Sequence, residues 1–198
     1  MSKRSGFGLA PILLTLQACV SNGAVSKDVP ATNLSGKSAE LADRFQADLQ
    51  GQLLAAMQQG GAAGANAVCH EVAPAIAHPL SNESGAHIRR IAFKQRNPSA
   101  VAEGDMRQKL EELAASPLGP DGKPASVQWT SGVGKSARLH YLRAIPMKEQ
   151  PCAACHGIDV APDVQARIRE LYPDDRATGF RSGELRGAIA ISWPVRGR

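Results

Sequence analysis

The sequence predicts an α+β domain in which helices flank an antiparallel sheet. An early segment, residues 38–59, places apolar side chains at every fourth position, which is the pattern of an amphipathic helix. Later segments, residues 87–93 and 139–145, mix β-branched and aromatic residues with charged ones, which is typical of strands. Residues 187–195 have the continuous apolar character of a buried strand. Because helical and extended segments are mixed without regular alternation, we expect an α+β fold.

The first 18 residues have the pattern of an export signal. Basic residues precede an apolar run, residues 7–18, that is too short to span a bilayer. The run leads into the sequence LQAC, residues 16–19, which resembles the lipobox of bacterial lipoproteins and would make Cys19 the lipid-carrying first residue of the mature chain. Ordinary cleavage nearby is the alternative, because Gln17 is unusual in a lipobox. We expect an exported, periplasmic protein that is held to the membrane by a lipid anchor only.

Composition limits the remaining chain to one domain. Residues 19–37 are small and polar, so they are expected to form a flexible tether in front of a domain that spans residues 38–198. Without the signal, the formal charge would be about +3, and no basic block or aromatic-interleaved basic stripe occurs. We therefore expect no nucleic-acid partner. Aromatic residues make up only 4% of the chain, a deficit that a large flat cofactor would offset in the core.

The first helix is expected over residues 38–59, because its apolar stripe runs into a glycine-rich stretch. The stripe consists of Leu41, Phe45, Leu49, Leu53 and Met57, and the glycines are Gly60, Gly61 and Gly64. A second, shorter helix is expected over residues 65–77, ending before the His78-Pro79 pair. Further along, the patterns predict helices at residues 104–115 and 163–171 and a short strand at residues 127–130.

Residues 152–156 carry the motif of covalent haem c attachment. Cys152 and Cys155 lie three positions apart, so each thiol can add to one haem vinyl group, and His156 can then supply a nitrogen ligand to the iron. A redox dithiol needs no such histidine, and a zinc site would need a second pair of ligands. The sequence therefore predicts one covalently bound haem c with His156 as an axial ligand.

No motif identifies the ligand on the opposite side of the iron. Small cytochromes c usually use a methionine downstream of the motif, but no methionine follows His156 in this sequence. Met147 lies only five residues before Cys152, which leaves little chain to reach the other side. The other methionines fit core stripes. Four histidines stay open as candidates: His70, His78, His87 and His140.

The cysteine count adds another candidate. Of four cysteines, Cys19 would carry lipid and Cys152 and Cys155 would carry haem, which leaves Cys69 unpaired in an oxidising compartment. Cys69 could be an inert thiol on an apolar helix face. A thiolate is also a strong iron ligand, so Cys69 is a candidate for the second axial position.

Several motifs resemble, in order and spacing, those of a haem c domain family first described in cyanobacteria, over about residues 38–196. The matching segments are Ala67 to Pro74, Ile88 to Arg90, Arg96 to Pro98, Cys152 to His156, Tyr172 to Asp174, Ala177 to Phe180 and Gly183 to Gly187. The resemblance implies a PAS-like fold, with the iron held by the motif histidine and a distant cysteine. Carried over, these ligands are His156 and Cys69. His70 departs from the pattern, since adjacent helical residues point about 100° apart and cannot both face the iron without distortion.

The resemblance also suggests a role for three arginines. Arg89, Arg90 and Arg96 could pair with haem propionates, because a guanidinium binds a carboxylate through two hydrogen bonds. An exposed, charged strand face is the alternative.

Two classes of function remain. A PAS-like fold with a displaceable thiolate ligand favours a redox or gas sensor, and a diatomic gas is then a candidate ligand. A lone domain without an output segment favours a low-potential electron carrier with a redox partner protein, since a thiolate stabilises ferric iron. We expect no enzymatic activity, because no carboxylate pair or Ser/His/Asp set stands out. The oligomeric state is left open.

Overall fold

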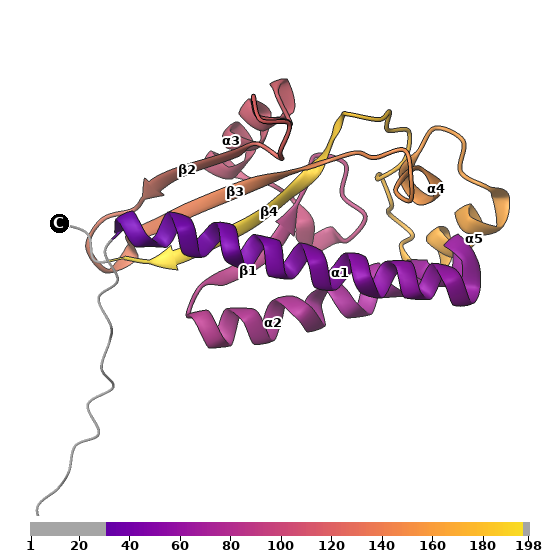
Figure 1. Ribbon diagram of the computed structural model, residues 1–198, viewed down its shortest axis with the longest axis horizontal. Helices are drawn as coiled ribbons and strands as arrows, with labels where there is room; N and C mark the ends of the chain where they lie inside the picture. Colours follow the sequence, from indigo (N-terminus) through magenta and orange to yellow (C-terminus); the bar gives the residue numbers. More distant parts are fainter. Residues whose placement is uncertain (1–30, 196–198) are drawn as a thin grey trace, which may run out of the picture.

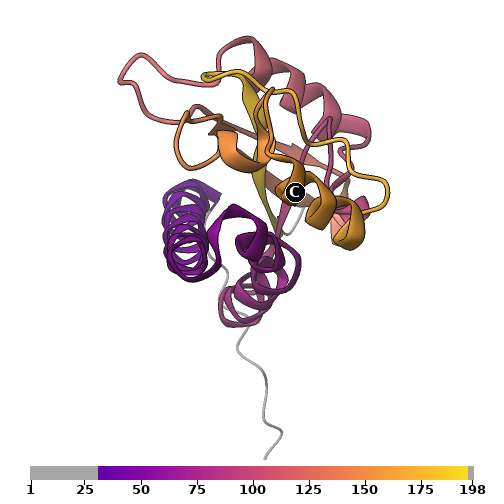
Figure 2. The ribbon, with the colours of Figure 1, turned by 90° about the vertical axis from the view of Figure 1, so that its right-hand side faces the viewer.

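The computed structural model describes residues 31–195 and confirms the α+β fold. A four-stranded antiparallel sheet lies between two helical layers, with helices α1 and α2 on one face and helix α3 on the other (Figure 1, Figure 2). The expected export signal and the lipidation site at Cys19 lie outside the described residues and stay predictions. Within the described range, no helix is both long enough and apolar enough to cross a bilayer.

Helix α1, Ala31–Ala67, begins earlier than the sequence predicted. The expected tether, residues 19–37, is therefore wrong at its C-terminal end, where the chain is already helical. Leu34 gives the physical reason. Its side chain is buried in the same core as Leu41 and Phe45, so one more turn of helix covers apolar surface.

The expected end of this helix at the glycines appears as a kink. Gly60 and Gly61 leave the helical conformation, with Gly61 at φ +64°, and the helix then resumes to Ala67. A five-residue π-helical turn, Val68–Val72, follows and leads into helix α2, Ala73–Ser84. The second helix was thus predicted in the right place, but neither its π-helical start nor its continuation through Pro79 was predicted. Pi-helical turns are rare and frequently lie at functional sites.

The sheet has the strand order β1-β4-β3-β2, and every neighbouring pair is antiparallel. The strands are His87–Ile91 (β1), Ser126–Ser131 (β2), Arg138–Pro146 (β3) and Leu185–Pro194 (β4). All four fall where the sequence predicted strands. Strand β4 is buried along most of its length because it pairs with β1 on one side and β3 on the other (Figure 1). This explains its continuous apolar sequence.

Each face of the sheet has its own core, because successive residues of a strand point to opposite faces. Tyr141, Ile189 and Ile191 pack under α1 and α2. Leu142 and Ala190 face the other side, where they pack under helix α3, Gly104–Ala115. The predicted range of α3 is confirmed at both ends.

Trp193 and Ser38 fix α1 to the end of the sheet. The indole Nε1 of Trp193 donates to Ser38 Oγ at 2.8 Å, and that hydroxyl donates to Leu34 O at 2.7 Å. Ser38 is fully buried. Replacing Ser38 with alanine leaves the buried indole N–H without an acceptor, so we expect a loss of about 1–3 kcal/mol in the free energy of unfolding. Urea unfolding measures it, with the partly exposed Ser35→Ala as control; equal stabilities of the two variants would contradict this role.

Candidate functional site

The attachment motif forms a tight turn beyond the end of β3. Cys152 precedes the single-turn helix α4, Ala153–His156, and the amide of His156 donates to Cys152 O at 3.0 Å. Gly157 ends the turn, where a Cβ would lie 2.6 Å from Ala153 O. The turn is therefore closed so tightly that glycine is required after the histidine. Helix α5, Pro162–Leu171, follows and packs against the end of α1.

The two motif thiols lie in different apolar surroundings. Cys152 packs with Met147 and Phe180. Cys155 packs toward Val164 of α5, and its Sγ lies 3.7 Å from Ala62 O of α1. The motif is thus held between the end of α1, α5 and the loop that leads into β4.

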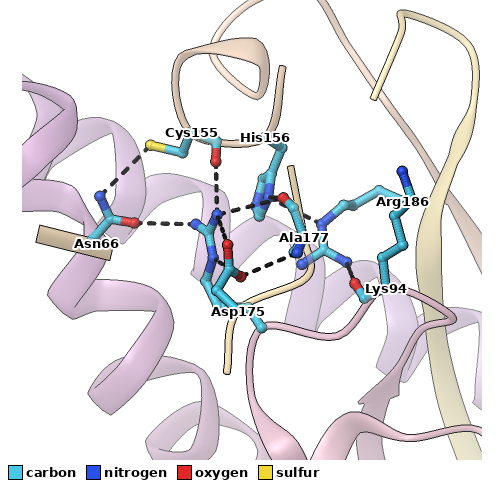
Figure 3. Close-up of polar contacts among 8 residues, drawn as sticks. Asn66, Lys94, Cys155, His156, Asp175, Ala177 and Arg186 are labelled. Carbon is cyan, nitrogen blue, oxygen red and sulfur yellow. Dashed lines mark hydrogen bonds and ion pairs between the residues drawn. The ribbon is translucent and has the colours of Figure 1, made fainter. Parts of the chain in front are cut away.

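The ring of His156 is oriented by a backbone carbonyl. Its Nδ1 lies 2.6 Å from Ala177 O, and because a carbonyl oxygen only accepts, Nδ1 must carry the proton (Figure 3). This tautomer leaves the lone pair of Nε2 available to a metal. Arg186 Nε lies 3.2 Å from the same Nδ1, and two donors cannot bond each other, so this contact is not a hydrogen bond in that tautomer.

Burial and positive neighbours keep His156 neutral. Burial is the main cause that holds the pKa of His156 well below 6.5, followed by the charges of Arg186, Arg96 and Arg90, while the Ala177 carbonyl opposes the shift. A neutral imidazole is the form that binds a metal.

The motif faces a cleft of about 290 Å³ between α1 and the sheet. Leu49, Leu53 and Met57 form an apolar wall on α1, and Cys152, Cys155 and His156 also line the cleft. Basic groups reach the cleft from Arg90, Lys148 and Arg186. Leu54 on α1 also lines it and is 48% exposed, so the cleft is open to solvent along that side. The arrangement suits a flat apolar group that carries peripheral negative charges.

The three predicted arginines separate in the structure. Only Arg90 lines the cleft with a guanidinium that has no ion pair among the described residues. Arg89 points to the α3 face, where it donates to Ser99 O and Val101 O and does not line the cleft, so the structure gives no support to its predicted contact with the cofactor. Arg96 is buried and forms an ion pair with Asp175 at 2.9 Å, which replaces the predicted propionate pairing with a protein partner. The alternation of side chains along β1 explains why neighbouring arginines differ.

Cys69 lies in the π-helical turn, but its side chain is outside the described part of the structure, so its role as a ligand stays a prediction. Asn66, about one helical turn before Cys69, shows where this part of the chain runs. Asn66 is 1% exposed, donates to Ala62 O at 3.0 Å, and lies 4.0 Å from Cys155 Sγ. The helical segment that leads to Cys69 therefore runs directly beside the attachment turn.

Other ligand candidates are placed less favourably. His70 is exposed and makes an edge contact with Tyr172, and His78 bonds Asn82 on the exposed face of α2. His140 lies on the α3 side of the sheet, bonded to Ser131 and Ser192. His87 is exposed at the start of β1. Met57 and Met147 both line the cleft, so neither belongs only to the core.

Sequence reasoning missed five residues of the site: Asn66, Lys148, Asp175, Ala177 and Arg186. Asn66 and Asp175 were missed because their role depends on a partner far away in the chain. Ala177 acts through its backbone carbonyl. Every residue has this group, so the identity of the residue does not indicate the role. Arg186 lies in one of the motifs that carried the resemblance. A basic side chain in such a motif was the available signal for a role at the site.

Acidification is expected to destabilise the haem-free protein. The pKa of His156 lies well below 6.5 and that of His140 is also lowered, in both cases mainly by burial, so the folded state binds fewer protons than the unfolded state. The free energy of unfolding is therefore highest above the pKa of the unfolded state, and it falls as the pH drops from 6.5 toward the folded pKa. Urea unfolding at about pH 7.5 and about pH 5.5 measures this, with His156→Gln as comparison. The variant should lose less stability between these pH values; an equal loss would contradict the assignment to His156.

Comparison with known proteins agrees with this geometry. A solved structure of the cyanobacterial heme-protein Tll0287 superimposes with a TM-score of 0.65 at 26% sequence identity, covering 86% of this chain and 99% of that one. No curated protein matches the chain. The sequence profile of the Tll0287-like family matches residues 22–194. The match covers nearly the whole chain and agrees with the resemblance inferred from its motifs, and the protein therefore belongs to the Tll0287-like family.

Proposed function

We propose that this protein binds one haem c covalently through Cys152 and Cys155, with His156 and Cys69 as axial ligands, and acts as a redox or gas sensor rather than as an enzyme. The observation that carries the proposal is the joint placement of the motif thiols and a neutral, Nδ1-protonated histidine on one open apolar cleft. The structural relative described as a heme-protein supports haem as the occupant.

The residues of the cleft fit such a group. The apolar wall on α1 would contact a porphyrin face, and Arg90, Lys148 and Arg186 offer positive charge for its propionates. When bound, a haem iron would supply one-electron chemistry and an exchangeable axial position. The chain itself orients the imidazole through Ala177, lines the site with the apolar side chains of Leu49 and Leu53, and brings the Cys69 segment to the site through α1.

A covalent haem is tested by mass spectrometry of the denatured protein, made in cells that possess the cytochrome c maturation machinery. The wild type should carry the mass of one haem, and the double variant Cys152→Ser/Cys155→Ser should not. Cys69→Ser is the matched cysteine control and should keep the covalent haem. A wild-type protein without added mass would overturn the proposal.

Sensor and carrier roles are separated by ligand release. We expect Cys69 to bind ferrous iron weakly, because reduction removes the positive charge that favours a negative sulfur ligand. The ferrous protein should then take up carbon monoxide. A ferrous form that stays six-coordinate and refuses the gas would instead support a low-potential electron carrier that serves a redox partner protein.

Export and lipid anchoring are also proposed, on the pattern of residues 1–19. We expect the protein to partition with membranes and to incorporate labelled fatty acid, because Cys19 would carry the lipid. The Cys19→Ala variant should lose the label and leave the membrane fraction. Labelling that persists in this variant would place the anchor elsewhere.

A further inference from the structure

The guanidinium of Arg96 joins three segments that are far apart in the sequence. It is 5% exposed and lies in the loop after β1. Its Nη1 donates to Asn66 Oδ1 at 3.1 Å, near the end of α1. Its Nη2 donates to Cys155 O at 2.7 Å, in the attachment turn. The third segment is the loop before β4, where Asp175 and Ala177 accept its remaining bonds (Figure 3).

Both the amide and the carbonyl group of Ala177 are held by neighbouring side chains. Asp175 Oδ1 accepts from Arg96 Nε at 2.9 Å and from the amide of Ala177 at 3.2 Å. Arg96 Nη2 lies 3.4 Å from the carbonyl oxygen of Ala177. This same oxygen accepts the ring proton of His156 at 2.6 Å. The position of one peptide group, and with it the orientation of His156, therefore depends on the buried Arg96–Asp175 pair.

Two groups compete for the Nδ1 atom of His156. The Ala177 carbonyl requires Nδ1 to donate, whereas the Arg186 Nε, 3.2 Å away, requires it to accept. If Ala177 moved away, Arg186 would hold the opposite tautomer, with the proton on Nε2 and no lone pair there for iron. The position of the Ala177 carbonyl thus decides which ring nitrogen of His156 has a lone pair for iron.

We propose that Arg96 is a positioning residue, which holds the Ala177 carbonyl and the attachment turn so that His156 presents an unprotonated Nε2 before haem arrives. Its bond to Asn66 fixes the end of α1, one turn before Cys69, against the same turn. The part of this inference that concerns haem rests on the proposed function; the part that concerns the tautomer does not. A buried ion pair contributes little net stability, and its best-attested benefit is a unique arrangement of the groups around it.

The test measures the His156 tautomer in the full-length, haem-free protein by the nitrogen-15 chemical shifts of its imidazole ring. The wild type should hold the proton on Nδ1. Arg96→Gln should shift the tautomer ratio toward Nε2–H by about tenfold or more, since each tenfold change needs only about 1.4 kcal/mol. Arg96→Lys should not restore the wild-type tautomer ratio. A single ammonium group cannot reach acceptors on three segments in the way the planar guanidinium can.

A second readout is the fraction of chains that carry covalent haem after expression with the maturation machinery. We expect this fraction to fall severalfold in both Arg96 variants. The matched control is Arg107→Gln, which removes an exposed arginine of α3 that pairs with Glu111 on the other face of the sheet. It should change neither the tautomer nor the loading.

The outcomes separate the inference from the proposed function. A folded Arg96→Gln protein with wild-type tautomer ratio and wild-type loading overturns the positioning role. If that variant does not fold, Asp175→Asn gives the answer, because it keeps a carbonyl for Arg96 but weakens the hold on Ala177, and an unchanged tautomer there overturns the role equally. A tautomer shift in a protein whose wild type never carries haem would support positioning and remove the haem assignment.

Discussion

Replacing Cys69 with serine is expected to raise the reduction potential of the bound haem by on the order of 0.1 V or more, because axial ligands set haem potentials over a range of about 0.8 V. A thiolate stabilises ferric iron through its negative charge, and a neutral hydroxyl does not. The ferric absorption spectrum should change in the same variant. Spectroelectrochemical titration measures both quantities in one experiment.

The control for this prediction is His70→Gln, which alters the next residue of the π-helical turn. His70 is exposed and contacts Tyr172, so we expect its loss to leave the potential near the wild-type value. An unchanged spectrum and potential in Cys69→Ser would show that Cys69 is not a ligand of the iron. The second ligand would then be sought among Met57 and Met147, which line the cleft.

Replacing Phe45 with alanine is expected to lower the free energy of unfolding of the haem-free protein by about 3–5 kcal/mol. Phe45 is 1% exposed and lies in the core between α1 and the sheet, so its removal leaves a cavity that the surrounding strands cannot fill. The control on the same helix is Leu54→Ala, whose side chain is 48% exposed. Urea unfolding should show a loss several times larger for Phe45→Ala than for Leu54→Ala. Equal losses would mean that α1 does not pack on the sheet as described.

The sequence predicted the strands and α3 well because their patterns report burial directly. Strand β4 is apolar without interruption since it has a neighbour on each side, and α3 ends where Ser116-Pro117 stops it. The range of α1 was predicted less well. A glycine pair normally ends a helix, but here Gly61 adopts φ +64° and the chain then returns to helical geometry. Packing of Ala62 and Ala63 against α5 accounts for the return.

The candidate site was predicted only where the chemistry depends on residues close together in the chain. Cys152, Cys155 and His156 form a local motif, and the structure places all three on one cleft. The role of Arg96 could not be predicted in this way, because its partners Asn66 and Asp175 lie 30 residues before it and 79 residues after it in the chain. An arginine in the sequence gives no indication of whether it meets a cofactor or a buried carboxylate.

The central position of β4 has a consequence for biogenesis. This strand leaves the ribosome after its neighbours β1 and β3, which cannot be joined into one sheet until it arrives. Cys152 and Cys155 precede it in the chain, so a period exists during synthesis in which both thiols are present while the sheet is still in two parts. If the two thiols carry haem as proposed, attachment in that interval would precede the joining of the sheet.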